Sequence, residues 1–275
     1  GNRHRSEAFT CWPCISMISV LADVLSITEN WLAVGIAVFL RIGAAFLVLP
    51  GLSDAMIPAR IRLGAALALS AVVTPMVHAD YPEINGPNQM LAVLFFTEAV
   101  SGLLLGIGLR LLIHALQIAG SIAANATSLA QLSAGAGGEP QPAIGQILML
   151  AGITLAIMGG LHVHLAQSFA RSYDVLPLGQ FPVAGDLGRW GIARVGSAFA
   201  LGFSLAAPFL IASLLYNLTL GAINKAMPQL MVALVGAPAI TLGSLVLLFI
   251  CAPFMLSVWH ESFLQAISRP MGIFP

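Results

Sequence analysis

Three ionisable side chains interrupt long apolar stretches of the sequence: Arg41, Glu98 and Arg110. A charged group in hydrocarbon is costly, so each of them should face protein or water. Glu98 and Arg110 stand twelve residues apart, which is roughly 18 Å along a helix, so they cannot pair with each other. Arg41 and Glu98 can pair between helices. The three charges thus indicate either structural pairing and snorkelling, or a hydrated conduit with its subunit contacts.

The other reactive residues do not combine into an active site. His162 and His164 are two residues apart in an apolar helix, so they point to nearly opposite faces and share a metal poorly. Cys11 and Cys14 have CxxC spacing but lack the βαβ context of a redox motif, and Cys251 lies in an apolar run. No nucleophile with a base and no pair of intramembrane carboxylates is evident. We therefore predict that the chain is not an enzyme and uses no cofactor and no metal.

The composition shows what kind of elements must position these residues. Of the 275 residues, 59% are hydrophobic and only 8% are charged, against about 25% charged in an ordinary soluble domain. No Asp, Glu, Lys or Arg occurs in residues 140–170, 195–224 or 226–260, although about 20 apolar residues suffice to cross a bilayer. Acidic and basic residues balance at 11 each, which excludes an electrostatic footprint for nucleic acid. The sequence predicts an all-α polytopic membrane protein.

Hydropathy predicts about six long helices, broken by proline or glycine and packed as hairpins. They lie near residues 31–49, 61–77, 89–113, 143–169, 195–223 and 230–258, and the third can continue to about residue 132. Residues 171–194 form a polar connection, whereas residues 224–229 are so short a connector that the last two helices must form an antiparallel hairpin. Residues 1–16 are an N-terminal extension of doubtful relevance, and residues 17–275 form one helical membrane domain.

Small residues mark the predicted helix contacts, and a non-helical segment separates the third and fourth helices. Gly102 and Gly106 have the GxxxG spacing of closely packed membrane helices. The glycines and prolines of residues 133–142 rule out a helix there. Because lipid cannot satisfy its peptide groups, this segment must lie outside the bilayer, be buried in protein, or line a watery cavity.

Short motifs in a fixed order carry a resemblance to a known family. The chain contains RIGAAFLVLP at 41–50, IPARIRLG at 57–64, a glycine-rich helix at 98–108, GGLH at 159–162, LPLG at 176–179, NLTLG at 217–221, AMPQL at 226–230 and VGAP at 235–238. In this order the motifs resemble the flagellar biosynthetic protein FliR family of type III secretion export-gate subunits, which includes virulence-system equivalents. The resemblance runs from about residue 18 to the C-terminus. Departures from the family pattern are Leu161, Met231 and Ala237.

The resemblance implies a function and partners. The chain would be a structural and pore-forming subunit of the bacterial flagellar type III protein export gate, which passes unfolded flagellar proteins across the inner membrane. Its partners would be the export-gate subunits FliP, FliQ and FlhB, the flagellar basal body, the unfolded export substrates and membrane lipid. One alternative is a virulence-type export subunit. Another is a small-solute secondary transporter, which predicts an internal repeat that the sequence does not display convincingly.

Two sets of residues are predicted to serve such a gate. The resemblance makes the non-helical segment a pore plug, with Gly135, Gly137, Gly138, Glu139 and Pro140 as its residues. The predicted structural and subunit-contact residues are Arg41, Pro58, Arg60, Arg62, Glu98, Arg110, Asn217, Gly221, Pro228, Gln229, Gly236 and Pro238. Among these, the arginines after Pro58 are expected to anchor the second helix, and the 224–229 turn is expected to contact partner subunits.

Overall fold

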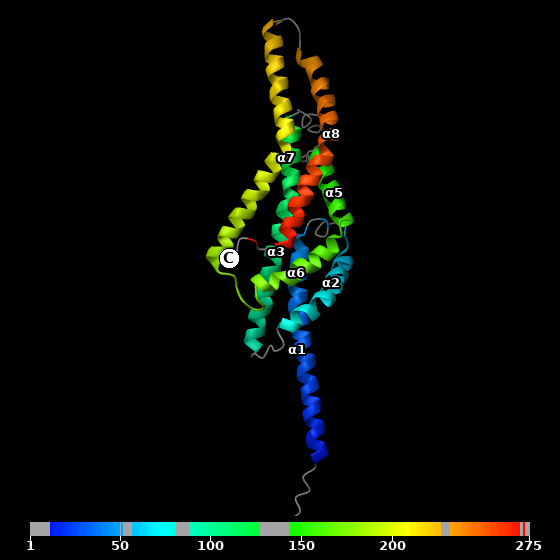
Figure 1. The fold of residues 1–275 in the computed structure, drawn as a ribbon, viewed down its shortest axis with the longest axis vertical. Coiled ribbons are helices and arrows are strands. Elements are labelled where there is room, and N and C mark those ends of the chain that lie inside the picture. Colours follow the sequence, from blue (N-terminus) through cyan, green and yellow to red (C-terminus); the bar gives the residue numbers. More distant parts are fainter. Residues whose placement is uncertain are drawn as a thin grey trace, which may run out of the picture.

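The computed structural model describes residues 12–49, 51, 57–80, 88–126, 143–226, 232–269 and 272. Within these residues the chain is helical and contains no strand (Figure 1). The helices are α1 (Trp12–Val48), α2 (Ala59–Asp80), α3 (Asn88–Ala126), α5 (Ala143–Met158), α6 (Leu161–Val175), α7 (Ala184–Ala226) and α8 (Val232–Ser268). Five of them are long and apolar enough to cross a membrane, and the bent pair of α5 and α6 is together long and apolar enough for a sixth crossing. The predicted all-α polytopic fold is confirmed.

Helix α3 runs through the middle of the molecule and contacts most of the other helices (Figure 1). It packs against α1 along one side, against α7 along another, and against α5 toward its C-terminal end. Its buried positions are often alanine, as at Ala115, Ala119 and Ala123. Such small side chains let helix backbones approach closely, which is how membrane helices gain packing energy. The central position of α3 therefore follows from its small-residue faces.

The last two helices form the antiparallel hairpin that the short connector predicts (Figure 1). Trp259 connects the C-terminal half of α8 to α3, since its buried indole Nε1–H donates to the Leu112 carbonyl of α3 at 2.8 Å. Large apolar side chains cover the outside of the hairpin, and Leu218 and Phe249 are 71% and 83% exposed. Such a surface suits lipid or other subunits rather than water.

The structure differs from the sequence prediction within the fourth span and in the connection that follows it. The predicted fourth span over 143–169 is a broken one, because the chain bends by 78° between α5 and α6. The break lies at Gly159 and Gly160, and Gly160 adopts φ +81°. The predicted polar connection over 171–194 is also too long, since only residues 176–183 are non-helical. Its polar side chains lie on exposed helical turns, as at Arg171 and Arg189, where charge is compatible with helix.

Replacing Gly160 with alanine is expected to lower the free energy of unfolding by about 1 kcal/mol, because an L side chain disfavours the left-handed backbone. A Cβ at this position meets no atom within 4 Å, so the effect isolates backbone strain. Gly160→Asn should cost less, since asparagine tolerates this conformation better. Unfolding in mixed micelles, titrated with denaturing detergent, measures both. Equal costs for alanine and asparagine would contradict the explanation.

Candidate functional site

The predicted pair of intramembrane charges forms in the structure. Arg41 of α1 donates from Nε to Glu98 Oε2 of α3 at 2.7 Å, and from Nη2 to Glu98 Oε1 at 3.0 Å. Both residues have no exposed surface. This two-pronged geometry is the strongest arrangement available to a guanidinium and a carboxylate. A buried pair is stable only when its remaining polar atoms are also satisfied, so the surroundings of both groups matter.

The guanidinium of Arg41 is held on its other side by α6 and the residues after it. Nη1 donates to Ser172 Oγ at 2.9 Å, and Nη2 also donates to the Leu176 carbonyl at 2.9 Å. The Tyr173 ring lies against the guanidinium, 3.6 Å from its central carbon. Hydrogen bonding and cation–π contact thus stabilise the buried cation.

The carboxylate of Glu98 receives two further hydrogen bonds. The Tyr173 hydroxyl donates to Oε2 at 3.3 Å, and the Gly179 backbone N–H donates to Oε1 at 3.2 Å. Gly179 has φ +74°, a conformation that favours glycine. The LPLG motif at 176–179 therefore bonds to both charges through its backbone. The Leu176 carbonyl accepts a hydrogen bond from Arg41, and the Gly179 N–H donates one to Glu98. We call Arg41, Glu98, Ser172, Tyr173, Leu176 and Gly179 the charge cluster.

Two glycines of α3 bring the charge cluster together. A Cβ added to Gly102 would lie 2.0 Å from the Arg41 carbonyl oxygen, and one added to Gly106 would lie 2.7 Å from the Ala45 carbonyl oxygen. The two backbones thus touch one turn beyond Glu98, at the residue that carries the guanidinium. The predicted close-packing role of Gly102 and Gly106 is confirmed at the α1–α3 crossing.

A second backbone contact joins α3 to α5. A Cβ on Gly120 would lie 2.2 Å from the Gly145 Cα atom. Sequence analysis missed this pair, because neither glycine belongs to a GxxxG repeat and the two are far apart in the chain. The small residues around Gly120 were the available signal. This contact fixes the helix that follows the predicted plug segment to the helix that precedes it.

Arg110 belongs to a different polar group, which runs along one side of α3. Its Nε donates to His114 Nε2 at 3.1 Å, and His114 Nδ1 lies within hydrogen-bond distance of Gln117 Oε1, at 2.5 Å. The Gln117 amide donates to the Met149 sulfur of α5 at 2.9 Å, and Ser121 donates back to the Gln117 carbonyl. The spacing of 4, 3 and 4 residues places all four on one helical face. We call Arg110, His114, Gln117 and Ser121 the α3 polar stripe; the sequence prediction singled out only its first member.

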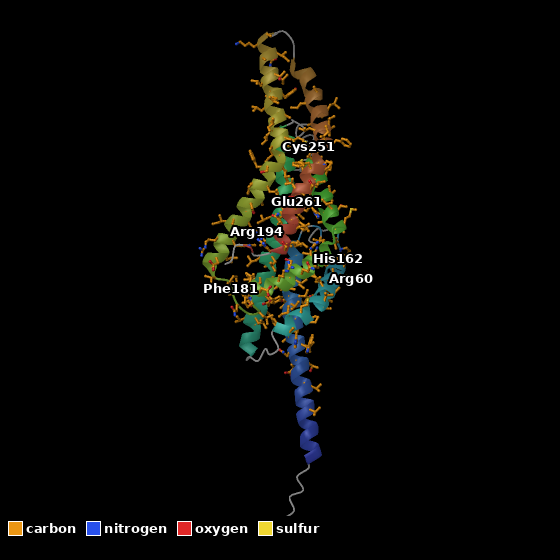
Figure 2. All side chains as sticks on the ribbon, viewed as in Figure 1. Arg60, His162, Phe181, Arg194, Cys251 and Glu261 are labelled. Carbon is orange, nitrogen blue, oxygen red and sulfur yellow. The ribbon has the colours of Figure 1, made fainter. Side chains whose placement is uncertain are left out.

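The other predicted residues lie away from the charge cluster. Pro58 precedes α2, and its carbonyl oxygen accepts hydrogen bonds from the backbone N–H groups of Ile61 and Arg62 at 3.0 and 3.3 Å. Arg60 is exposed at the start of this helix (Figure 2), and Arg62 is half-buried. Asn217 and Gly221 lie on the exposed part of α7, and Gly236 and Pro238 fall within α8. Pro228 and Gln229 lie outside the described residues, as do the five predicted plug residues Gly135, Gly137, Gly138, Glu139 and Pro140.

The fold and the charge cluster define a class of protein: a multi-pass helical membrane subunit whose buried charges hold its own helices together. Among the residues that the structure describes, no three His, Cys, Asp or Glu side chains gather as a metal site would require. The chain belongs to the bacterial export proteins, family 1, whose sequence model matches residues 32–266. It is therefore a membrane component of a bacterial protein export apparatus.

Relatives of known name extend this result. The chain is 30% identical to the flagellar biosynthetic protein FliR of Caulobacter vibrioides over 84% of its own length and 92% of that protein. It is 30% identical to FliR of Bacillus subtilis, over 78% and 84% of the two chains. It is also 29% identical to the Yop proteins translocation protein T of Yersinia pestis, over 78% and 84%. The family predicted from the ordered motifs is confirmed, and it includes virulence-system members.

Proposed function

We propose that this chain is the FliR-type subunit of a flagellar type III protein export gate in the bacterial inner membrane. It assembles with FliP- and FliQ-type subunits, contacts an FlhB-type subunit, and forms part of the wall past which unfolded flagellar proteins move. It acts as a structural conduit and not as a catalyst. The match of residues 32–266 to the export family carries the proposal, and the match to 92% of the Caulobacter flagellar relative, against 84% of the Yersinia relative, supports the flagellar assignment.

The length of the apolar surface on α7 supports assembly with other subunits. Exposed apolar side chains extend from Ile192 to Ile223, which is about 47 Å of helix at 1.5 Å per residue. The hydrocarbon core is about 30 Å thick, so even a helix tilted by 40° needs only about 39 Å to cross it. Lipid tails alone do not cover this surface. The remainder suits protein partners, as in a hetero-oligomeric gate.

The α3 polar stripe supports a watery face on the same subunit. Arg110 is exposed at its beginning, and the other three residues are half-buried. An exposed guanidinium within a membrane helix requires water or a polar neighbour. A conduit for polypeptide supplies both, and the stripe ends six residues before residue 127, where the stretch that includes the predicted plug begins. The proposed wall of the conduit is therefore this face of α3.

Purification in mild detergent tests the assignment. Affinity-tagged chain expressed with the FliP- and FliQ-type proteins of the same bacterium should elute as one stable hetero-oligomer. A chain that elutes alone and binds a small solute would instead support a transporter. Secretion of virulence effectors in place of hook and filament proteins would support the second candidate function, which the Yersinia relative favours.

Deleting residues 134–138 is expected to make the assembled gate leak. Under the proposed function these five small residues (Ala-Gly-Ala-Gly-Gly) help to close the pore at rest. Their deletion leaves a shorter plug segment that no longer fills the pore. Ion conductance of membranes that contain the intact hetero-oligomer measures the effect. A variant with the same five residues in permuted order keeps the length and should stay closed. Conductance equal to that of the unmodified gate, with assembly confirmed, would contradict the plug.

A further inference from the structure

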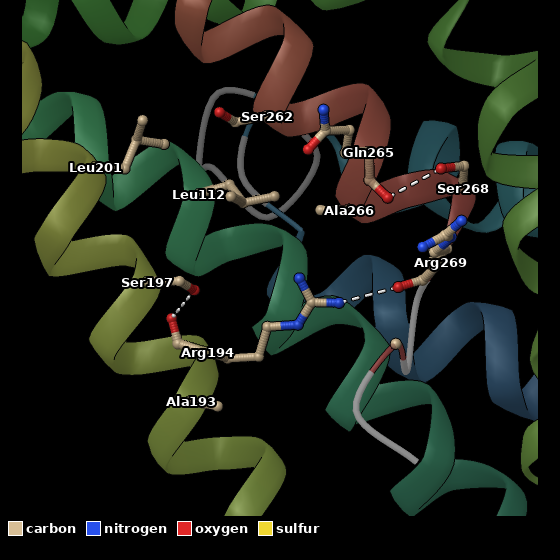
Figure 3. A pocket seen from close by; sticks show the side chains of 11 residues that line it. Leu112, Ala193, Arg194, Ser197, Leu201, Ser262, Gln265, Ala266, Ser268 and Arg269 are labelled. Carbon is tan, nitrogen blue, oxygen red and sulfur yellow. Dashed lines mark hydrogen bonds between the residues drawn. The ribbon is translucent and has the colours of Figure 1, made fainter. Parts of the chain in front are cut away.

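A polar cavity of about 750 Å³ lies between the beginning of α7 and the end of α8 (Figure 3). Arg194 and Ser197 line it from α7, while Ser262, Gln265 and Ser268 line it from α8 together with Arg269. Of the described residues that line it, two are cations and none is an acid. The charge cluster and the α3 polar stripe contribute nothing to this lining, so the cavity is a separate feature.

The arginines around this cavity are held in place by the end of α8. Arg194 Nη2 donates to the Arg269 carbonyl at 3.0 Å, and Arg171 of α6 donates to the Ser268 carbonyl at 3.3 Å. The last carbonyls of a helix lack partners within it, so cations from other helices satisfy them. Figure 3 shows the Arg194 guanidinium directed into the space between α7 and α8. Two guanidinium groups, from α6 and α7, thus bond to carbonyls at the end of α8.

This cavity lies where the charge-free runs of α7 and α8 meet charged residues. Arg194 is the last charged residue before the charge-free run of α7, and Glu261 is the first after the charge-free run of α8. The two lie at similar heights along the long axis (Figure 2). Glu261 does not line the cavity, and Asp186 is paired with Arg189 on the exposed start of α7. Neither acid thus stands among the described residues that line the cavity.

From this geometry we infer that the cavity binds a phosphate group through Arg194 and Arg269, with the Gln265 amide as an additional donor. Guanidinium groups match phosphate oxygens in pairs, and basic pockets between membrane helices bind anionic headgroups. A phospholipid headgroup reaches this level of the membrane from the side. Inorganic phosphate can reach it from the adjacent water. Both sources present the same chemical group to the same arginines.

Native mass spectrometry of the full chain in mild detergent tests the site. The probes are phosphatidylglycerol, phosphatidylcholine and inorganic phosphate. We expect phosphatidylglycerol to bind at least tenfold more tightly than phosphatidylcholine. Arg194→Gln with Arg269→Gln should lose at least tenfold of this affinity, whereas Arg60→Gln, at an exposed arginine on α2, should retain it. If millimolar inorganic phosphate competes, the free ion is the ligand; if it does not, the lipid headgroup is.

A second variant separates binding from folding. Ser197→Phe fills the cavity from the exposed side of α7 and leaves every arginine in place, so it should abolish the preference for phosphatidylglycerol while helicity by circular dichroism is unchanged. Equal binding of the two lipids, with no competition by inorganic phosphate, would overturn the inference. So would unchanged affinity in both the arginine and the Ser197 variants. None of these outcomes depends on whether the chain exports protein.

Discussion

Arg41→Leu is expected to lower the free energy of unfolding by about 3–5 kcal/mol, because it leaves the Glu98 carboxylate buried without its cation. The substitution also removes the donors to Ser172 Oγ and to the Leu176 carbonyl, and with them the link from α1 to α6. Titration of the purified chain with denaturing detergent in mixed micelles, followed by tryptophan fluorescence, measures the change.

The matched control is the other ion pair that the structure describes. Arg189 and Asp186 approach to the same 2.7 Å, but their side chains are 78% and 33% exposed. Arg189→Leu should therefore cost less than about 1 kcal/mol. Arg41→Leu combined with Glu98→Leu should recover part of the single-variant loss, since no charge is then stranded. If Arg41→Leu costs no more than Arg189→Leu, the charge cluster does not hold the helices together.

Gly102→Ala is expected to be nearly as damaging, although it adds only a methyl group. The new Cβ would lie 2.0 Å from the Arg41 carbonyl oxygen, so the α1 and α3 backbones must separate along their crossing. Overpacking of this kind costs about 3 kcal/mol at the upper end of its usual range, because no flexible side chain can yield. The same unfolding titration reports the loss, together with the yield of folded chain.

Gly43 offers the same substitution on the facing helix without the clash. A Cβ at Gly43 meets nothing within 4 Å, so Gly43→Ala should be neutral or stabilising by up to about 1 kcal/mol. Gly102→Ala combined with Arg41→Leu should cost less than the two separate losses added, since both act at one crossing. Equal effects of alanine at positions 43 and 102 would show that the two backbones are not in contact.

Much of this architecture could be predicted from the sequence. Charge-free runs longer than a bilayer requires located the spans, and two opposite charges inside separate spans led to the Arg41–Glu98 pair, because a lone charge in hydrocarbon is so costly. The GxxxG spacing indicated the contact at Gly102. In each case the type and spacing of the side chains alone determine where a helix can lie or what it must contact.

The features that sequence analysis missed depend on backbone conformation or on distant contacts. Hydropathy cannot register the 78° bend, since α5 and α6 together are as apolar as one continuous span. The Leu176 carbonyl and the Gly179 N–H serve the charge cluster through the main chain, which every residue possesses. The contact of Gly120 with Gly145 joins residues 25 positions apart, and no local pattern marks it.

The most direct test of the central claim is the secretion of flagellar proteins by a strain that lacks this chain. Hook and filament proteins in the culture supernatant are quantified for the deletion strain, with and without the gene restored on a plasmid. As a subunit of the export gate, the chain should be indispensable, so the deletion should abolish export while the proteins accumulate in the cell, and restoration should return it. Export from the deletion strain at the level of the parent strain would contradict the account.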